Sequence, residues 1–396
     1  MSGNWMQTIA LGWLVLERTQ SGSQLGLVLA LQFLPMLFLG PWGGVVADRF
    51  NKRTILYVTQ TLLGVLALCL GALVATDLIE LWMLYGFALS VGVINAVDNP
   101  TRQIFVSSMV EPSYVKNAVT LNSIEVNLAR AIGPSIGGIL IATVGLAFCF
   151  IINAVTYIAV IAVLTQMRGA ELHGGPNRVS KKGQLMEGWR YVLASPVLRN
   201  VLLVMAIIGT MSYEFQVSLP LLAQGTFMGD ASSYAALLSA MGVGSVLGGL
   251  FAAGRKRASA QSLTGLIFLF GASLCLVASM PTLGFAIAGM ILVGFFSINV
   301  TSLANTILQL ESKPEMRGRV MALWSMAMLG STPIGGPIVG YIGQYAGPRW
   351  GIAVGGLAAA VAGVIAYYTL KKDTAIKTIP VAESEQSDLH EETKLH

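Results

Sequence analysis

Long apolar segments recur along almost the whole chain, and short polar breaks separate them. A helix that crosses the ~30 Å hydrocarbon core of a bilayer needs about 20 predominantly apolar residues. Most of the segments reach this length, so the pattern predicts twelve membrane-spanning helices. The expected spans are residues 6–16, 24–47, 54–76, 80–98, 118–144, 146–166, 197–222, 232–254, 261–280, 282–304, 320–345 and 348–370.

The composition agrees with a membrane protein. Of the 396 residues, 55% are hydrophobic and only 11% are charged, whereas a soluble domain carries roughly a quarter charged residues. So few charges cannot cover a water-facing surface of this size. The expected fold class is therefore an all-α membrane protein.

The first expected span is shorter than the others. Residues 6–16 form a helix of only ~16 Å at 1.5 Å per residue, and Glu17 and Arg18 follow directly. A cleaved signal peptide is the alternative, but it would carry a basic segment in front of the apolar run. We expect that the first helix is truncated and that the native start lies upstream of Met1.

Basic residues fall in every second loop. Of the 24 Lys and Arg residues, 21 lie in one set of alternating loops and in the C-terminal tail. Since loops rich in Lys and Arg stay in the cytoplasm, these loops and the C-terminus are expected on that side of a bacterial inner membrane. The net charge of +5 is explained by this orientation, and nucleic-acid binding is not expected.

The two parts of the chain resemble each other at an offset of just over 200 residues. Gly133, Pro134 and Gly137 correspond to Gly336, Pro337 and Gly340. The repeat predicts two halves of six helices each, and transporters built in this way place the substrate between their halves. The expected domains are a first bundle at 1–166, a cytoplasmic linker at 167–196, a second bundle at 197–370 and a disordered tail at 371–396.

The loop after the second expected span carries the sequence GVVADRFNKR at residues 44–53. This segment resembles the signature loop of the major facilitator superfamily, with Asn51 in place of the usual Gly. The resemblance implies the fold of that superfamily and a conformational latch in which Asp48 holds the halves together on the cytoplasmic side. The latch residues on this loop would be Gly44, Asp48, Arg49, Lys52 and Arg53.

Two further segments extend the resemblance. Residues 129–138, ARAIGPSIGG, are similar to the antiporter motif of the superfamily, which is associated with exporters, although Ala129 replaces the usual first Gly. The segments WMQT at 5–8, DNPTRQ at 98–103 and RGRVM at 317–321 resemble the bacterial enterobactin-exporter and macrolide-efflux branch. The resemblance implies gating roles for Asp98, Arg102, Arg130, Gly133 and Pro134.

Ionisable groups inside the bilayer are costly and are functional candidates. Arg130 and Glu214 lie at similar depths of about 18 and 20 Å along their spans, so a salt bridge between them is possible. A carboxyl that alternates between burial and a nearby cation changes its proton affinity, which makes Glu214 a candidate for proton coupling. A structural counter-ion is the alternative, and Tyr213 and Gln216 are candidates for the substrate cavity.

Other functions find no support in the sequence. There is no phosphate-binding loop for an ATP motor, no hydrolase motif and no metal-ligand spacing among the three His residues. We expect a monomeric, proton-driven exporter of drug-like or siderophore-like molecules without enzymatic activity or cofactors. An importer on the same fold and a membrane scaffold or sensor that does not transport remain alternatives.

The truncated first span gives a direct test. Mass spectrometry of the intact protein from its native source should detect residues in front of Met1. A native N-terminus at Met1 would contradict this expectation.

Overall fold

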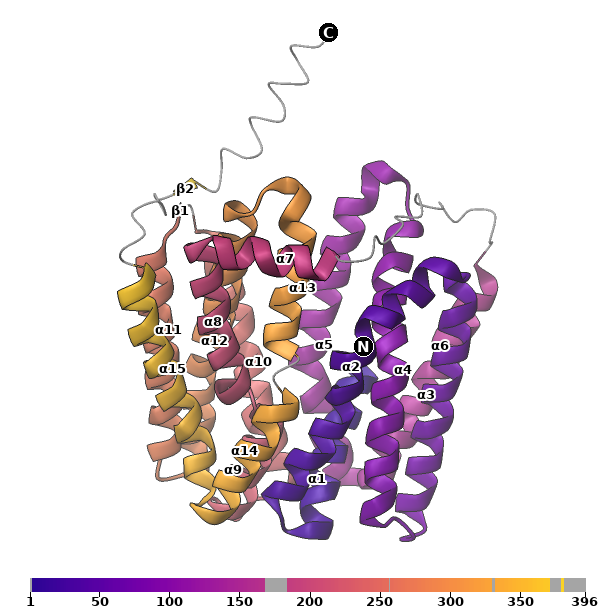
Figure 1. Cartoon of the computed structure of the whole chain (residues 1–396). Coiled ribbons are helices and arrows are strands. Elements are labelled where there is room, and N and C mark those ends of the chain that lie inside the picture. Colours follow the sequence, from indigo (N-terminus) through magenta and orange to yellow (C-terminus); the bar gives the residue numbers. More distant parts are fainter. Residues whose placement is uncertain (1, 168–183, 256, 330–331, 371–378, 381–396) are drawn as a thin grey trace.

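The computed structural model describes residues 2–167, 184–255, 257–329, 332–370 and 379–380. Long helices run side by side through the molecule, and one short helix lies across their upper ends (Figure 1). The first helices are α1 (Ser2–Thr19), α2 (Gly22–Arg49), α3 (Lys52–Ala75), α4 (Leu81–Ser108), the 3-10 turn η1 (Pro112–Tyr114), α5 (Val115–Val144) and α6 (Leu146–Gln166). The later helices are α7 (Gln184–Ala194), α8 (Pro196–Ser212), α9 (Phe215–Gly225), α10 (Ala231–Ala253), α11 (Ala260–Ser279), α12 (Leu283–Glu311), α13 (Pro314–Leu329), α14 (Thr332–Tyr345) and α15 (Pro348–Leu370).

Within these ranges, nine helical segments are long and apolar enough to cross a membrane. Helix α1 and helix α5 are not among them, nor is either of the shorter helices α13 and α14. Large side chains such as Val58, Leu250 and Ile158 are more than half exposed on the outer faces, as expected where lipid is the solvent. The prediction of an all-α, multi-pass membrane protein is confirmed.

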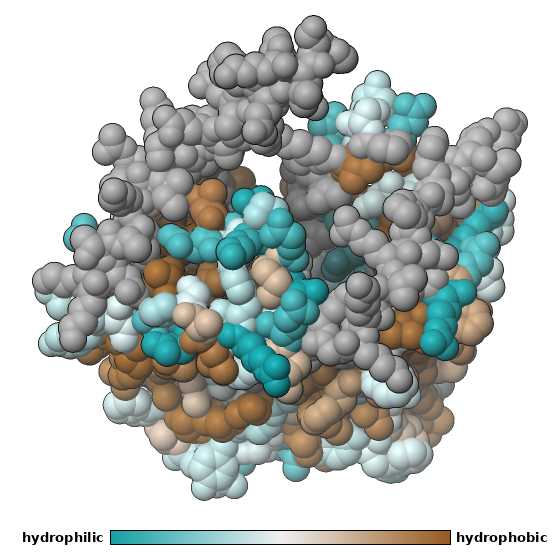
Figure 2. Space-filling model, turned by 45° about the horizontal axis from the view of Figure 1, so that its top comes forward, coloured by the Kyte–Doolittle hydropathy of each residue, from teal (hydrophilic) through white to brown (hydrophobic). Residues whose placement is uncertain are grey.

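The two ends of the molecule differ in charge. Arg49, Lys52, Arg53, Arg255 and Lys313 lie at the end that carries α7, which we call the basic end. Figure 2 brings this end forward, and hydrophilic residues gather over it while hydrophobic residues cover the flank below. Short polar side chains begin the helices at both ends: Asn51 caps α3 with bonds from the amides of Arg53 and Thr54, and Asp230 caps α10 through the amide of Ser233.

Glycines bring helices into backbone contact in both parts of the chain. A Cβ atom at Gly43 or Gly92 would lie within 2.3 Å of a carbonyl oxygen on the other helix of the α2–α4 pair. At Gly244 and Gly294, a Cβ would lie 1.9 Å from a carbonyl oxygen across the α10–α12 pair. The two crossings therefore share one construction, in which small residues replace side-chain packing, and this agrees with the internal repeat.

Helices from the two parts of the chain meet mainly at the end opposite the basic end. Gly22 and Gly26 of α2 face Gly340 and Gly336 of α14, and Cβ atoms at Gly22, Gly26 and Gly340 would each lie within 2.6 Å of the facing carbonyl oxygen. The Ser21 hydroxyl and the Ser23 amide both donate to Gln344 Oε1, at 2.8 and 3.0 Å. We call this contact the α2–α14 seam.

The structure corrects several expected boundaries. The segment 197–222 is not one helix, because α8 ends at Ser212 and α9 starts at Phe215. In the segment 320–345, the structure describes α13 up to Leu329 and α14 from Thr332. Hydropathy continues across the break between α8 and α9 and therefore did not reveal it.

Three more differences concern the basic end. Helix α4 continues to Ser108 rather than ending at residue 98, so Asp98 and Arg102 lie inside a helix and not in a turn. Part of the expected linker forms α7. In the tail, Ile379–Pro380 (β2) pairs antiparallel with Arg257–Ala258 (β1), so these two tail residues are ordered, and the rest of the tail lies outside the described residues.

The helix crossings predict a position-specific effect of added volume. Gly244→Val should destabilise the protein by about 1–3 kcal/mol, because the new side chain has no space against the Ile291 carbonyl. Gly249→Val, on the same helix but with no neighbouring atom within 4 Å of its Cβ, is the matched control. Thermal unfolding in one detergent would compare the two, and equal melting temperatures would contradict the packing.

Candidate functional site

The Glu214 side chain lies at the break between α8 and α9. The residue caps the start of α9 with φ −81° and ψ 44°, and only 4% of it is exposed. Its carboxylate accepts a hydrogen bond from the Thr332 side chain. The second oxygen, Oε1, has no hydrogen-bond partner within the described part of the chain. A buried carboxylate with one unpaired oxygen is unusual, since buried polar atoms almost always have partners.

The carboxylate points to the first turn of α14. A Cβ at Gly335 would lie 2.9 Å from Glu214 Oε1 and 1.8 Å from the Thr210 carbonyl oxygen. Glycine is therefore required at this position for α14 to approach α8 so closely. The first amides of a helix have no partners within the helix and carry a partial positive charge, so the start of α14 is a favourable site for the ionised carboxylate.

The same turn of α14 also touches α2. A Cβ at Gly336 would lie 3.3 Å from the Gly26 carbonyl oxygen and 3.6 Å from Glu214 Oε2. Glu214 thus lies next to the α2–α14 seam, because Gly336 is close to both Gly26 and the Glu214 carboxylate. Any change that moves the start of α14 relative to Glu214 also changes the contact between α2 and α14.

A second buried acid lies toward the basic end. Asp98 is fully buried, and its Oδ1 accepts hydrogen bonds from Thr59 Oγ1 at 2.6 Å and from Gln60 Nε2 at 2.8 Å. Its Oδ2 forms an ion pair with Arg102, one helical turn further along α4. The sequence pointed to Asp98 and Arg102 but not to their neighbours on α3. The only signal for Thr59 and Gln60 was that both are polar residues in an otherwise apolar helix. Their partners fix α3 against α4.

The loop between α2 and α3 has a structural role that the sequence did not show. Arg53 donates from Nε to the Leu164 carbonyl at 2.9 Å and from Nη2 to the Thr165 carbonyl at 3.1 Å. A cation at these last carbonyls complements the negative end of α6. Arg49 is exposed, Lys52 is partly exposed, and no atom lies within 4 Å of a Cβ built at Gly44. The Asp48 side chain is outside the described part.

The other predicted residues lie in α5, in the break between α8 and α9, and in α9. Arg130, Gly133 and Pro134 belong to α5 and Gly133 is buried, but the side chains of Arg130 and Pro134 lie outside the described part. The possible Arg130–Glu214 salt bridge therefore stays a prediction. The Tyr213 hydroxyl donates to the Ser297 carbonyl of α12 at 2.9 Å, whereas the Gln216 carbonyl faces Gly12 of α1.

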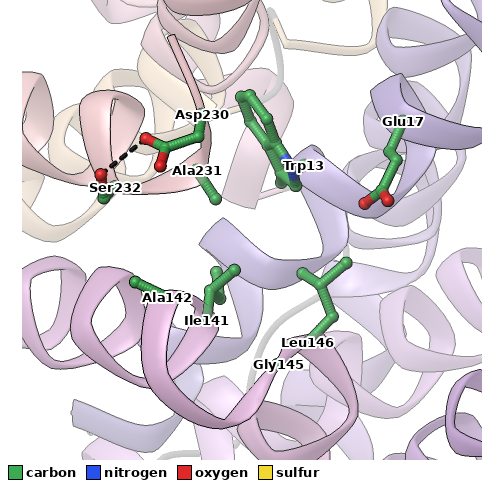
Figure 3. Close-up of a pocket in the computed structure, with 9 residues that line it drawn as sticks. All are labelled: Trp13, Glu17, Ile141, Ala142, Gly145, Leu146, Asp230, Ala231 and Ser232. Atoms are coloured by element: carbon green, nitrogen blue, oxygen red, sulfur yellow. Dashed lines mark hydrogen bonds between the residues drawn. The ribbon is translucent and has the colours of Figure 1, made fainter.

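Two cavities accompany these sites. One, of about 380 Å³, is lined by residues from α1 and α3 to α6, including Asn4, Gln60, Arg102, Glu125 and Tyr157. The other, of about 320 Å³, lies at the opposite end between α1, α5, α6 and α10. Figure 3 shows Trp13 between Glu17 and Asp230, with the Asp230 carboxylate turned toward Ser232. In the described ranges, no cluster of three His, Cys, Asp or Glu side chains could hold a metal ion.

Comparison with known families decides the class of this protein. A model of the transmembrane secretion effectors, a family of the major facilitator superfamily, matches residues 1–395. The chain belongs to this family. It is a transporter rather than an enzyme, and the resemblance to the enterobactin-exporter branch is confirmed.

Individual relatives agree with this assignment. An enterobactin exporter of Shigella flexneri is 28% identical over 88% of this chain and 83% of its own. A staphyloferrin A transporter of Staphylococcus aureus is 24% identical, and the match spans 62% of each chain. The chain thus spans less than two thirds of the staphyloferrin A transporter.

Solved structures show the fold. An inward-facing, unoccupied bacterial homologue of the human lysosomal transporter Spinster superposes with a TM-score of 0.75 at 14% identity, over 96% of both chains. A D-xylose–proton symporter gives a TM-score of 0.72 at 10% identity, over 96% of this chain and 98% of its own. The major facilitator fold predicted from the residue 44–53 loop is therefore confirmed.

The Asp98 network predicts a large loss of stability on neutralisation. Asp98→Asn removes the charge that the Arg102 guanidinium, Thr59 and Gln60 all bond in a buried position, and the free energy of unfolding should fall by on the order of 3 kcal/mol. Asp77→Asn is the control, because the Asp77–Arg18 pair is exposed and should contribute less than about 1 kcal/mol. Denaturation in one detergent would compare both, and an equal loss would contradict the role of the buried network.

Proposed function

We propose that this protein exports a small, siderophore-like or drug-like molecule from the cytoplasm in exchange for protons. Twelve spans form two six-helix halves, at 1–166 and 197–370, which rock against each other as a monomer in a bacterial inner membrane. The linker at 167–196 and the tail at 371–396 lie in the cytoplasm, as the basic residues of the alternating loops indicate. The names of the two relatives support the substrate class, and the name of the enterobactin exporter supports the direction.

The proposal rests on the Glu214 carboxylate. In its ionised form, the carboxylate is stabilised by the Thr332 hydroxyl and by the start of α14. Protonation removes the charge that holds α14 against the α8–α9 break. The two protonation states therefore favour different positions of α14 relative to α8.

Glu214 can couple protonation to access because of its place beside the α2–α14 seam. The seam closes the end opposite the basic end, through Gly26 and Gly336 and through Gln344 with its two donors. At the basic end of α2, by contrast, no atom lies within 4 Å of a Cβ at Gly40 or Gly44. In this proposal, the described arrangement is a state open to the cytoplasm. Opening of the seam exposes Glu214 to protons from outside.

The segment 129–138 of α5 gives a second argument for export as the direction of transport. Its resemblance to the antiporter motif favours export, and Arg130 is placed there as a gating group near mid-membrane. Asp98, Arg102 and the loop residues Asp48, Arg49, Lys52 and Arg53 form the cytoplasmic latch of the proposal. The roles of Gln216 and Tyr213 in the substrate cavity follow as part of the same proposal, with Gln216 facing α1.

Transport by Glu214→Gln is the decisive test. Energised cells would be loaded with catecholate siderophores, carboxylate siderophores, macrolides and dyes. Wild type should export at least one compound, and a protonophore should stop this export. Glu214→Gln should reduce proton-driven efflux at least 10-fold, because the amide keeps the shape but neither binds nor releases a proton.

Glu111→Gln, which changes an exposed acid outside the expected spans, is the matched control and should transport as wild type. Downhill exchange of substrate without a proton gradient should persist in Glu214→Gln, and this distinguishes lost coupling from lost folding. Full proton-driven efflux by Glu214→Gln would refute coupling through Glu214. Uptake of substrate by energised cells would show an importer instead.

A further inference from the structure

Helix α7 differs from all other helices in its direction. It lies across the basic end of the molecule, roughly perpendicular to the long helices and in front of α8, α12 and α13 (Figure 1). Gly188 and Val192 are buried on one side of it. By contrast, Met186, Trp189 and Leu193 are 58%, 51% and 46% exposed. A short helix at the edge of a membrane protein thus presents three large apolar side chains outward.

The exposed apolar residues form a single stripe. At 100° per residue, the spacing of three and four residues puts Met186, Trp189 and Leu193 within a narrow sector of the helix. The buried Gly188 and Val192 lie on an adjacent sector. The exposed Arg190 and Glu187 continue around the other side of the stripe. The helix therefore has a protein-facing side, an apolar side and a charged side in sequence around its axis.

Helix α7 is fixed to the bundle by polar contacts. Glu187 Oε1 pairs with Arg319 Nη1 of α13 at 2.6 Å, and the Tyr191 hydroxyl accepts from the Lys313 amide at 3.1 Å. A Cβ at Gly188 would lie 2.9 Å from the Arg319 Cβ. These contacts hold the orientation of α7 about its axis, so the apolar stripe cannot simply turn inward.

We propose that the apolar stripe of α7 is embedded in the membrane interface of the leaflet at the basic end, between lipid headgroups and acyl chains. Trp is enriched at this depth because its ring is amphipathic, and amphipathic helices with basic residues lie in this plane. Two more aromatic side chains toward the basic end, Trp42 and Tyr368, are 69% and 67% exposed. Arg190 and Arg199 are exposed there and complement anionic headgroups.

This placement has a consequence for the bundle. Since α7 is joined to Arg319 of α13 and to Lys313, which directly precedes α13, the interface anchors α13 as well. Lipid contact at α7 thus restrains the position of α13 relative to the membrane surface. The stripe would serve as a fixed point on the membrane surface against which the adjoining helices change position.

Nitroxide labels can locate the stripe. Met186→Cys, Trp189→Cys and Leu193→Cys would be labelled singly, with Cys69, Cys149 and Cys275 replaced, in vesicles of phosphatidylcholine and phosphatidylglycerol. Collisions with oxygen, which concentrates in lipid, should exceed those with a water-soluble nickel complex several-fold at all three positions. Glu315→Cys, an exposed polar position on α13, should show the reverse preference.

A second measurement avoids the cysteine replacements. Lipids brominated near the headgroup should quench wild-type tryptophan fluorescence more than that of Trp189→Phe, and the difference reports Trp189 alone. Because the vesicles contain only this protein and lipid, an interface with another protein cannot produce the effect. Water-exposed labels at all three positions, matching Glu315→Cys, or no difference in quenching, would overturn the proposal.

Discussion

A peptide group in hydrocarbon has no water to bond, and this constraint shapes the whole molecule. It forces the chain into helices, and it allows a helix to break only where protein surrounds the break. The break between α8 and α9 meets this condition because α14 packs against it, with Gly335 beside the Glu214 carboxylate. The Glu214 carboxylate lies beside the first turn of α14, and the partial positive charge of that end of the helix stabilises the ionised carboxylate.

Two buried acids illustrate different uses of the same chemistry. Asp98 has a partner for each oxygen, including the guanidinium of Arg102, and it ties α3 to α4. Within the described residues, Glu214 has a partner for one oxygen only, and it lies between α8, α9 and α14. A fully satisfied network rigidifies its surroundings, whereas a partly satisfied group is the natural site for a change of charge. The contrast separates a structural acid from the candidate for proton coupling.

Glycine provides the mobility that this arrangement needs. The α2–α14 seam brings Gly22 and Gly26 against Gly336 and Gly340 with few side chains between the backbones. At such a contact the backbones are close but few side chains interdigitate. Separation of the helices therefore requires few changes in side-chain packing. The bonds of Ser21 and Ser23 to Gln344 close its outer end. The seam and Glu214 thus lie against the same turn of α14, so a movement of this turn would change both contacts.

The sequence by itself showed that lipid surrounds much of the chain, and it determined the fold class and the family. Hydropathy and short loop motifs are local properties of the chain, so no coordinates were needed. It also singled out Glu214, since a charge in an apolar run is visible without coordinates, and it pointed to Asp98 through the DNPTRQ segment. It could not show the break between α8 and α9, because apolar residues continue on both sides of it. Nor could it find Thr332 and Gly335 beside Glu214, or α7 on α13. Those contacts join residues more than 100 positions apart, and only the packing of the helices decides which of them meet.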